Sequence, residues 1–140
     1  MPLEEIQRLP VAALAADDCA LLLWAVMPQL PDALDVIKAW GFEFQTTGFT
    51  WVKQNPSGNG LFTGMGNWTR ANAELCLLAT RGSPMRINAD VSQVVITPIG
   101  EHSAKPEEVR QRIERLLNGP YLELFGRRAV DGWTVWGNEL

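Results

Sequence analysis

Hydrophobic residues along the chain form short continuous runs separated by polar and glycine-rich segments. Residues 19–26 and 73–80 are almost entirely apolar, and such runs are typical of strands buried on both faces of a parallel sheet. Residues 91–97 and 121–125 are further apolar segments, and we expect them to form strands as well. Two more extended segments are expected after the first run, at residues 42–45 and 50–53.

Helical spacing of apolar residues predicts three helices. The first covers residues 3–14 and is interrupted by Pro10. The second begins at Pro31 and ends at Gly41, a residue suited to a helix C-cap. The third begins at Pro106, and the acidic residues that follow complement the positive end of the helix dipole. Three arginines of this helix are expected to face water: Arg110, Arg112 and Arg115.

Strands that alternate with helices predict an α/β fold, with a mixed, mostly parallel sheet flanked by helices. The chain has 140 residues, of which 46% are hydrophobic and 20% charged, so we expect residues 1–140 to form one domain with one core. Residues 55–66 are rich in glycine and are expected to form a loop.

Charge and cysteine content narrow the possible partners and compartments. A formal net charge of -4 argues against wrapping of nucleic acid by charge alone, so any such contact must be local. Cys19 and Cys76 lie within apolar runs, which favours buried free thiols in a reducing compartment. No leader opens the chain, and no apolar run approaches the roughly 20 residues that a membrane span needs. We therefore expect a soluble, cytoplasmic protein with no membrane partner.

The segment Phe125-Gly126-Arg127 is a candidate ligand site at the end of a predicted strand. In an open α/β sheet, ligands bind beyond the carboxyl ends of strands, and a glycine lets a ligand approach the main chain. An arginine can bind a carboxylate through two parallel hydrogen bonds. Taken alone, the three residues equally fit a strand that ends in a turn with a surface arginine.

A wider pattern resembles a known family. Lys105-Pro106 precedes a helix, Phe125-Gly126-Arg127 closes a strand, and a Gly-Trp…Gly-Asn-Glu segment follows, ending at Glu139. This order resembles the S-adenosylmethionine-binding half of the MT-A70 family of adenine-N6 methyltransferases, in its prokaryotic or phage form. The resemblance implies a Rossmann-like methyltransferase fold in the permuted, beta-class order, with S-adenosylmethionine as cofactor.

The resemblance also implies which residues bind the cofactor. Carried over onto this sequence, they are Lys105, Leu124, Phe125, Arg127, Asn138 and Glu139. The family's RNA-modifying writer has a His-Asn pair shortly after its arginine, whereas Arg128-Ala129-Val130 stands here. That departure removes part of the expected set of cofactor contacts.

A third segment, from Gly64 to Glu74, resembles the family's block beside the target base and the nucleic-acid path. Trp68 can stack on a base, Arg70 can pair with a phosphate, and Glu74 can accept a hydrogen bond from an exocyclic amine. A glycine-rich loop that leads into a core strand with an exposed glutamate explains the same residues equally well. Lys53, Arg81 and Arg86 could extend a weak basic rim, but scattered surface charges are the favoured interpretation.

The chain contains no Pro-Pro pair and therefore lacks the Asp-Pro-Pro-Trp motif with which the family performs its chemistry. No catalytic residue is assigned for that reason, and no metal site is expected. The resemblance implies that the chain is truncated at its N-terminus and lacks a strand between residues 121–125 and 19–26. We expect these two strands either to pair directly or to receive a strand from another chain, in a homodimer or heterodimer.

These observations predict an S-adenosylmethionine-dependent adenine-N6 methyltransferase of nucleic acid, inactive as this chain alone. DNA is favoured over RNA as the substrate, because the short form without zinc fingers resembles the prokaryotic branch of the family. The alternative is a catalytically silent subunit that binds nucleic acid for an active partner. An unrelated small α/β protein is the third interpretation.

Overall fold

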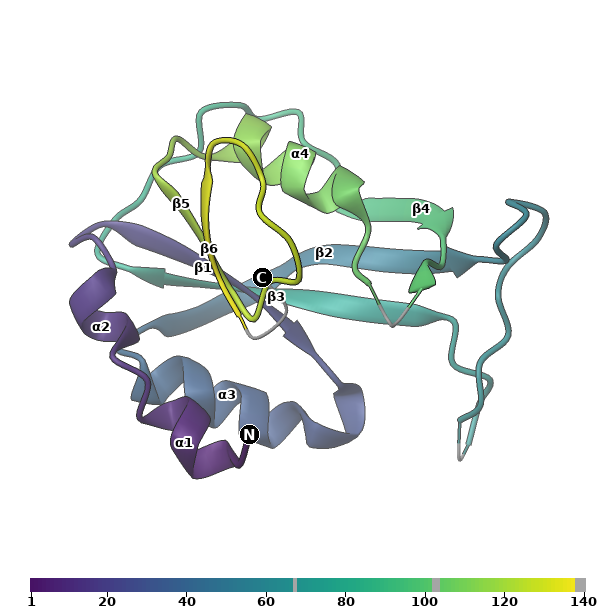
Figure 1. Ribbon diagram of the computed structural model, residues 1–140, viewed down its shortest axis with the longest axis horizontal. Coiled ribbons are helices and arrows are strands. Elements are labelled where there is room, and N and C mark those ends of the chain that lie inside the picture. Colours follow the sequence, from purple (N-terminus) through teal and green to yellow (C-terminus); the bar gives the residue numbers. More distant parts are fainter. Residues whose placement is uncertain (67, 102–103, 138–140) are drawn as a thin grey trace.

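The computed structural model describes residues 1–66, 68–101 and 104–137, which form a four-stranded sheet with helices on both faces and a separate strand pair (Figure 1). The strands are β1 (Cys19–Ala25), β2 (Glu43–Gln54), β3 (Ala73–Arg81), β4 (Val94–Pro98), β5 (Tyr121–Leu124) and β6 (Trp133–Trp136). The helices are α1 (Leu3–Gln7), α2 (Val11–Leu14), α3 (Leu30–Ala39) and α4 (Glu107–Leu116), with a 3-10 turn at Met27–Gln29.

The α/β class and a mixed sheet are confirmed, but the prediction of mainly parallel pairing is wrong. In the order β1-β3-β2-β4, strand β3 runs antiparallel to both β1 and β2, and β2 and β4 are parallel. A continuous apolar run indicates that a strand is buried on both faces of its sheet. The strands of an antiparallel sheet between two helical layers are buried on both faces as well. The sequence pattern therefore predicted burial correctly and strand direction incorrectly.

Two hydrophobic clusters lie on opposite faces of the four-stranded sheet. On one face, α3 buries Val36, Ile37 and Trp40 together with residues of β1 and β3, and α1 packs alongside. On the other face, Val109 of α4 packs with a cluster that includes Phe49 of β2. Figure 1 shows the sheet between α4 on one side and α1 and α3 on the other. The predicted single core is thus divided in two by the sheet.

The predicted helices are present at nearly the expected bounds. The first is divided at Pro10 into α1 and α2, as its sequence predicts. Gly41 follows α3 with φ +86°, a left-handed conformation that glycine adopts without a Cβ penalty. Pro106 is the N-cap of α4 rather than its first helical residue. None of the helices among the described residues is long and apolar enough to cross a membrane.

Strand β2 joins the two extended segments that the sequence predicts separately. Its pairing with β3 shifts register between Phe44 and Thr46 and again between Thr47 and Phe49. A Cβ at Gly48 would lie 2.8 Å from Leu22 Cδ1 and 3.3 Å from the Cys76 carbonyl oxygen, so a side chain here would require the Leu22 side chain to move. Exposed polar residues and a glycine in the middle of a strand look like a break in sequence, but here they mark a bulge.

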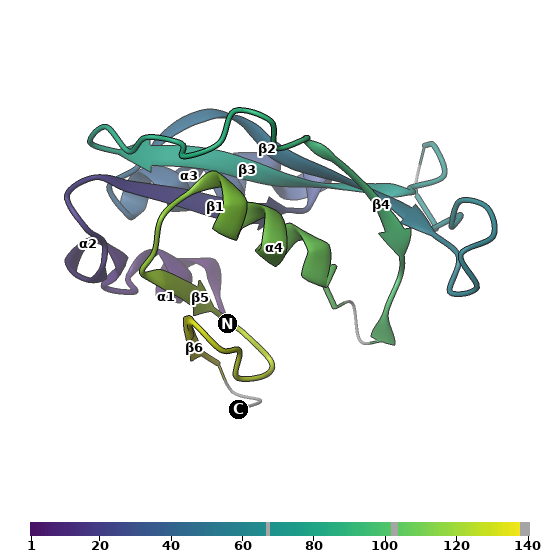
Figure 2. The same ribbon diagram turned by 90° about the horizontal axis from the view of Figure 1, so that it is seen from above.

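Strands β5 and β6 form a parallel pair of their own, apart from the four-stranded sheet (Figure 2). Direct pairing between residues 19–26 and 121–125 is therefore wrong: β1 pairs with β3, and β5 pairs with β6. Leu124 of β5 nevertheless packs against the cluster that contains α3. No third strand lies between β1 and β5 in the described part of the chain, and a strand supplied by another chain stays a prediction.

Two adjacent valines of β4 test which face of the sheet α4 covers. Val95 is 0% exposed and Val94 is 48% exposed. We expect Val95→Ala to lower the free energy of unfolding by about 2–3 kcal/mol, through lost burial and a residual cavity. Val94→Ala, the matched control, should cost under roughly 1 kcal/mol. Urea unfolding of both variants measures the difference, and equal losses would show that the register of β4 is wrong.

Candidate functional site

Glu74 lies at one end of the sheet, between two lysines from different segments. Its Oε2 lies 2.6 Å from Nζ of Lys53 on β2, and its Oε1 lies 2.5 Å from Nζ of Lys105, which precedes α4. Glu74 is opposite Trp51 in the pairing of β2 with β3, so both side chains lie on the face that α4 covers. Because Glu74 lies near the start of β3, its side chain can contact Lys105 in the segment before α4.

Two tryptophan rings pack against the two lysine ammonium groups. The rings of Trp24 on β1 and Trp51 on β2 meet edge to face, with centroids 6.3 Å apart. The Lys53 ammonium lies 5.4 Å from the Trp51 centroid, and the Lys105 ammonium lies 5.3 Å from the Trp24 centroid. Both distances allow a cation–π attraction. We call these residues the Lys–Glu–Trp cluster: Trp24, Trp51, Lys53, Glu74 and Lys105.

The two lysines keep Glu74 ionised. Burial raises the pKa of the Glu74 carboxyl, but hydrogen bonds from Lys105 and Lys53 outweigh this effect, and the pKa lies below its ordinary value of 4.5. Two ammonium groups share one carboxylate, so the cluster carries a net positive charge. Nearby, burial raises the pKa of the Cys76 thiol to about 12, which makes it an inert core residue. Cys19 and Cys76 are both free thiols, as predicted, but Cys19 is only half-buried.

Within the described part of the chain, the cluster has unused hydrogen-bonding capacity. A carboxylate oxygen can accept two hydrogen bonds, and each Glu74 oxygen accepts one from a lysine. Glu74 can therefore still accept a hydrogen bond from an amine, while the two ammonium groups can donate to anionic or carbonyl oxygens. The side chains of Lys53, Glu74 and Lys105 are 20%, 23% and 36% exposed, so an incoming group can reach them.

The Phe125-Gly126-Arg127 turn is shaped by close packing. Phe125 has φ +61°, a left-handed conformation that is uncommon for a bulky residue. A Cβ at Gly126 would lie 2.2 Å from Val135 Cγ1, and the Gly126 amide donates a 3.0 Å hydrogen bond to the Trp136 carbonyl. This position therefore requires glycine. Phe125 and Trp136 are 47% and 44% exposed and meet edge to face, with centroids 5.4 Å apart.

The turn and Lys105 lie at the same end of α4. Arg128, directly after the turn, forms an ion pair with Glu107, and Glu107 comes two residues after Lys105. Arg127 is exposed, whereas Leu124 packs its side chain against the core, so contact between Leu124 and a ligand would come from its main chain. The predicted cofactor residues Asn138 and Glu139 lie outside the described residues.

The nucleic-acid candidates divide into two groups. Glu74 belongs to the Lys–Glu–Trp cluster, but Trp68 is 99% exposed and Arg70 is exposed on the loop between β2 and β3. Among the described residues, no hydrogen bond or ion pair joins Trp68 or Arg70 to Glu74. The sequence favoured a scattered surface charge at Lys53, and Trp51 was not predicted. The available signal was their spacing of two residues in a predicted strand, which places both side chains on the same face.

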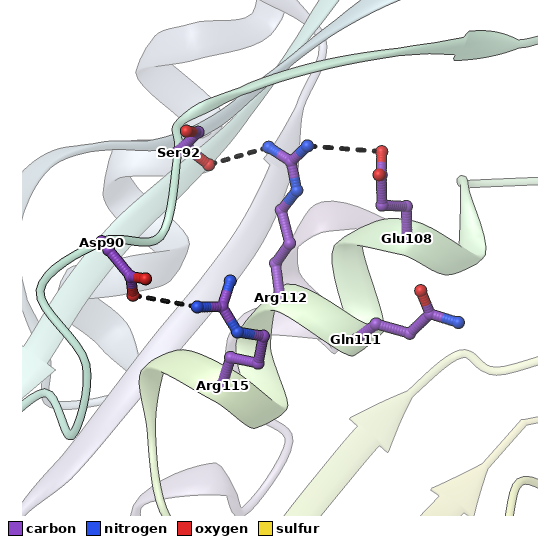
Figure 3. A pocket seen from close by; sticks show the side chains of 6 residues that line it. All are labelled: Asp90, Ser92, Glu108, Gln111, Arg112 and Arg115. Atoms are coloured by element: carbon purple, nitrogen blue, oxygen red, sulfur yellow. Dashed lines mark hydrogen bonds and ion pairs between the residues drawn. The ribbon is translucent and has the colours of Figure 1, made fainter.

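Two cavities lie away from this end of the sheet. The first, about 280 Å³, lies between α4 and the segment before β4, and its arginines already have partners (Figure 3). Arg112 donates to the Ser92 and Val94 carbonyls and its side chain is 20% exposed, so the prediction that it faces water is wrong. Arg115 pairs with Asp90 but is 53% exposed, and for this arginine the prediction is confirmed. The second cavity, about 410 Å³, is lined mainly by apolar residues near the C-terminal end of α4.

Comparison with known proteins assigns the family. Residues 1–139 match the sequence model of the MT-A70 family. The chain is 32% identical, over its whole length, to the type II methyltransferase M.MunI of Mycoplasma sp. It is 33% identical over 98% of its length to the N(6)-adenosine-methyltransferase MT-A70-like protein of Drosophila melanogaster, and 32% identical over 98% to the human N(6)-adenosine-methyltransferase catalytic subunit METTL3.

The chain spans 58% of the Mycoplasma protein, 23% of the Drosophila protein and 24% of the human protein. The match covers β1 to β6, and with them the Lys–Glu–Trp cluster and the Phe125-Gly126-Arg127 turn. The resemblance seen in the sequence is thereby confirmed. This chain belongs to the MT-A70 family of methyltransferases.

Proposed function

We propose that this chain forms the cofactor-binding and base-binding part of an S-adenosylmethionine-dependent adenine-N6 methyltransferase that acts on DNA. The observation that carries the proposal is the ionised Glu74, held by Lys53 and Lys105 at the end of α4 where the Phe125-Gly126-Arg127 turn also lies. Two relatives are named as N(6)-adenosine methyltransferases, which supports adenine N6 as the target.

The residues of the turn fit S-adenosylmethionine. Its carboxylate matches the planar guanidinium of Arg127, which can bind it through paired hydrogen bonds. The partly exposed ring of Phe125 offers an apolar surface for the flat adenine of the cofactor. When bound, the cofactor supplies the methyl group; the residues of this chain hold and orient it.

The Lys–Glu–Trp cluster fits the target base. Glu74 is ionised and can accept a hydrogen bond from an exocyclic amine, which helps to orient that amine. Trp68 and Arg70, exposed on the loop beside the cluster end of the sheet, suit stacking on a base and pairing with a phosphate. DNA is favoured because the chain is 32% identical over its whole length to a bacterial type II methyltransferase.

A methyl-transfer assay tests the proposed reaction. Because the chain contains no Asp-Pro-Pro-Trp, we expect the 140 residues alone to transfer no methyl group above background. A longer version with that motif upstream should methylate adenine in duplex DNA, and more slowly in RNA of the same sequence. Radiolabelled methyl incorporation measures both, and DNA with N6-methyladenine at every adenine is the control. Methylation of cytosine, or none by the longer version, would contradict the proposal.

Titration with S-adenosylmethionine tests the turn. We expect the chain to bind the cofactor and Arg127→Ala to weaken binding by about tenfold, the loss expected for a charge-assisted hydrogen bond. Arg86→Ala, an exposed arginine elsewhere on the molecule, is the matched control and should leave the dissociation constant unchanged. Calorimetry gives the constants. Equal affinity in the two variants, or no binding at millimolar cofactor, would exclude the proposed turn site.

The charge of Glu74 can be tested through stability. Its pKa is lowered by folding, so its contribution is fully present above pH 4.5 and is lost as the pH falls through the lower folded value. We therefore expect Glu74→Gln to lower the unfolding free energy at pH 7, and the deficit to shrink as the pH approaches 3. Glu43→Gln, an exposed strand glutamate, serves as the control. A deficit that stays constant from pH 7 to pH 3 would argue against an ionised, lysine-bound Glu74.

A further inference from the structure

The guanidinium of Arg110 contacts residues of α4, β5 and β6. It donates to the two carboxylate oxygens of Glu107 at 3.0 and 2.8 Å, and to Glu123 Oε1 at 2.5 Å. Its Cζ lies 5.3 Å from the centroid of the Trp133 ring. The Arg110 side chain is 15% exposed, against the prediction that it faces water. Contacts between charged groups are stronger where water is largely excluded.

The Glu123 end of this network reaches the Phe125-Gly126-Arg127 turn. A Cβ at Gly126 would lie 3.0 Å from Glu123 Oε1, so the carboxylate that binds Arg110 packs directly against the turn. The opposite side of the turn is held by the hydrogen bond from the Gly126 amide to the Trp136 carbonyl. A shift of the Glu123 carboxylate would therefore shift one of the two surfaces that hold Gly126.

The Glu107 end reaches the segment that carries Lys105. Glu107 also accepts a 2.5 Å hydrogen bond from Arg128, which directly follows the turn. Burial raises the pKa of the Glu107 carboxyl, but Arg110 and Arg128 outweigh this effect and hold that pKa below 4.5. A single ionised carboxylate at the start of α4 thus binds both Arg110 and the exit of the turn.

A second set of contacts attaches β5 and β6 to α4 without Arg110. The rings of Tyr121 and Trp133 stack with centroids 4.8 Å apart, and the Tyr121 hydroxyl donates to the Leu117 carbonyl at 2.6 Å. The Trp133 indole donates to Glu114 Oε2 at 2.8 Å. These contacts lie at the start of both strands, whereas Arg110 acts nearer the turn. Loss of Arg110 should therefore loosen the turn and leave the strand pair attached.

We propose that Arg110 is a positioning residue, which places the Phe125-Gly126-Arg127 turn relative to Lys105 and so sets the affinity for the cofactor. This inference rests on the proposed function, in which the turn and Lys105 bind S-adenosylmethionine. Arg110 itself is joined to the turn through Glu123 and to the Lys105 segment through Glu107, so it acts on the cofactor through other residues.

Calorimetric titration of the 140-residue chain with S-adenosylmethionine is the first test. Arg110→Met keeps the length of the side chain and removes its charge, and we expect it to raise the dissociation constant about tenfold. Arg110→Lys should recover part of the affinity, because an ammonium can still pair with Glu123. Arg115→Met is the matched control. Arg115 lies on the same helix and pairs with Asp90, and the two side chains are 53% and 76% exposed. We expect this variant to bind the cofactor as tightly as the wild type.

Hydrogen exchange at the Gly126 amide, measured by NMR without cofactor, is the second test. We expect faster exchange in Arg110→Met but not in Arg115→Met, while the Trp133 indole, bound to Glu114, stays protected in both. Unchanged affinity in Arg110→Met overturns the proposal, and so does reduced affinity without faster Gly126 exchange. If the wild-type chain binds no cofactor, the proposed function is overturned. The exchange rate of the Gly126 amide in Arg110→Met then still shows whether Arg110 holds the turn in place.

Discussion

The ion pairing of Glu74 is the constraint on which the rest of the site depends. A half-buried carboxylate is costly unless it is paired and hydrogen-bonded, and Glu74 meets this condition only by recruiting lysines from two other segments. Lys53 comes with β2, which is already fixed by pairing to β3. Lys105 comes from outside the sheet, so its contact with Glu74 fixes where the chain enters α4.

Helix α4 in turn positions the strand pair of β5 and β6. The helix covers one face of the sheet through Val109 and is connected to β5 and β6 by charged and aromatic contacts. β5 and β6 form no ladder with the four-stranded sheet in the described part of the chain, and a two-stranded unit has little stability by itself. Helix α4 thus connects the cluster at Glu74 to the turn at Gly126, and Leu124 adds a direct contact between β5 and the core.

Local patterns in the sequence predicted most of this architecture. Pro10, Gly41 and Pro106 marked helix boundaries within one or two residues, and apolar runs marked the buried strands. Strand direction could not be predicted, because the pattern of a buried strand is the same in either direction. The roles of Lys53 and Arg110 could not be predicted either. A charged residue on a strand or helix looks solvent-exposed until the partners, here 21 and 13 residues away in Glu74 and Glu123, are placed beside it.

The conformation of Phe125 links the packing to the chemistry. A bulky residue in the left-handed region costs of order 1–3 kcal/mol, and the cost persists only where the surroundings over-determine the backbone. Gly126 is fixed on one side by Val135 and Trp136 and on the other by Glu123, so the main chain has no room to relax. A glycine at position 125 would remove the strain at no steric cost, whereas phenylalanine places an aromatic ring, 47% exposed, at the edge of the turn. A strained residue whose ring is exposed beside an arginine supports the proposed ligand-binding role of this turn.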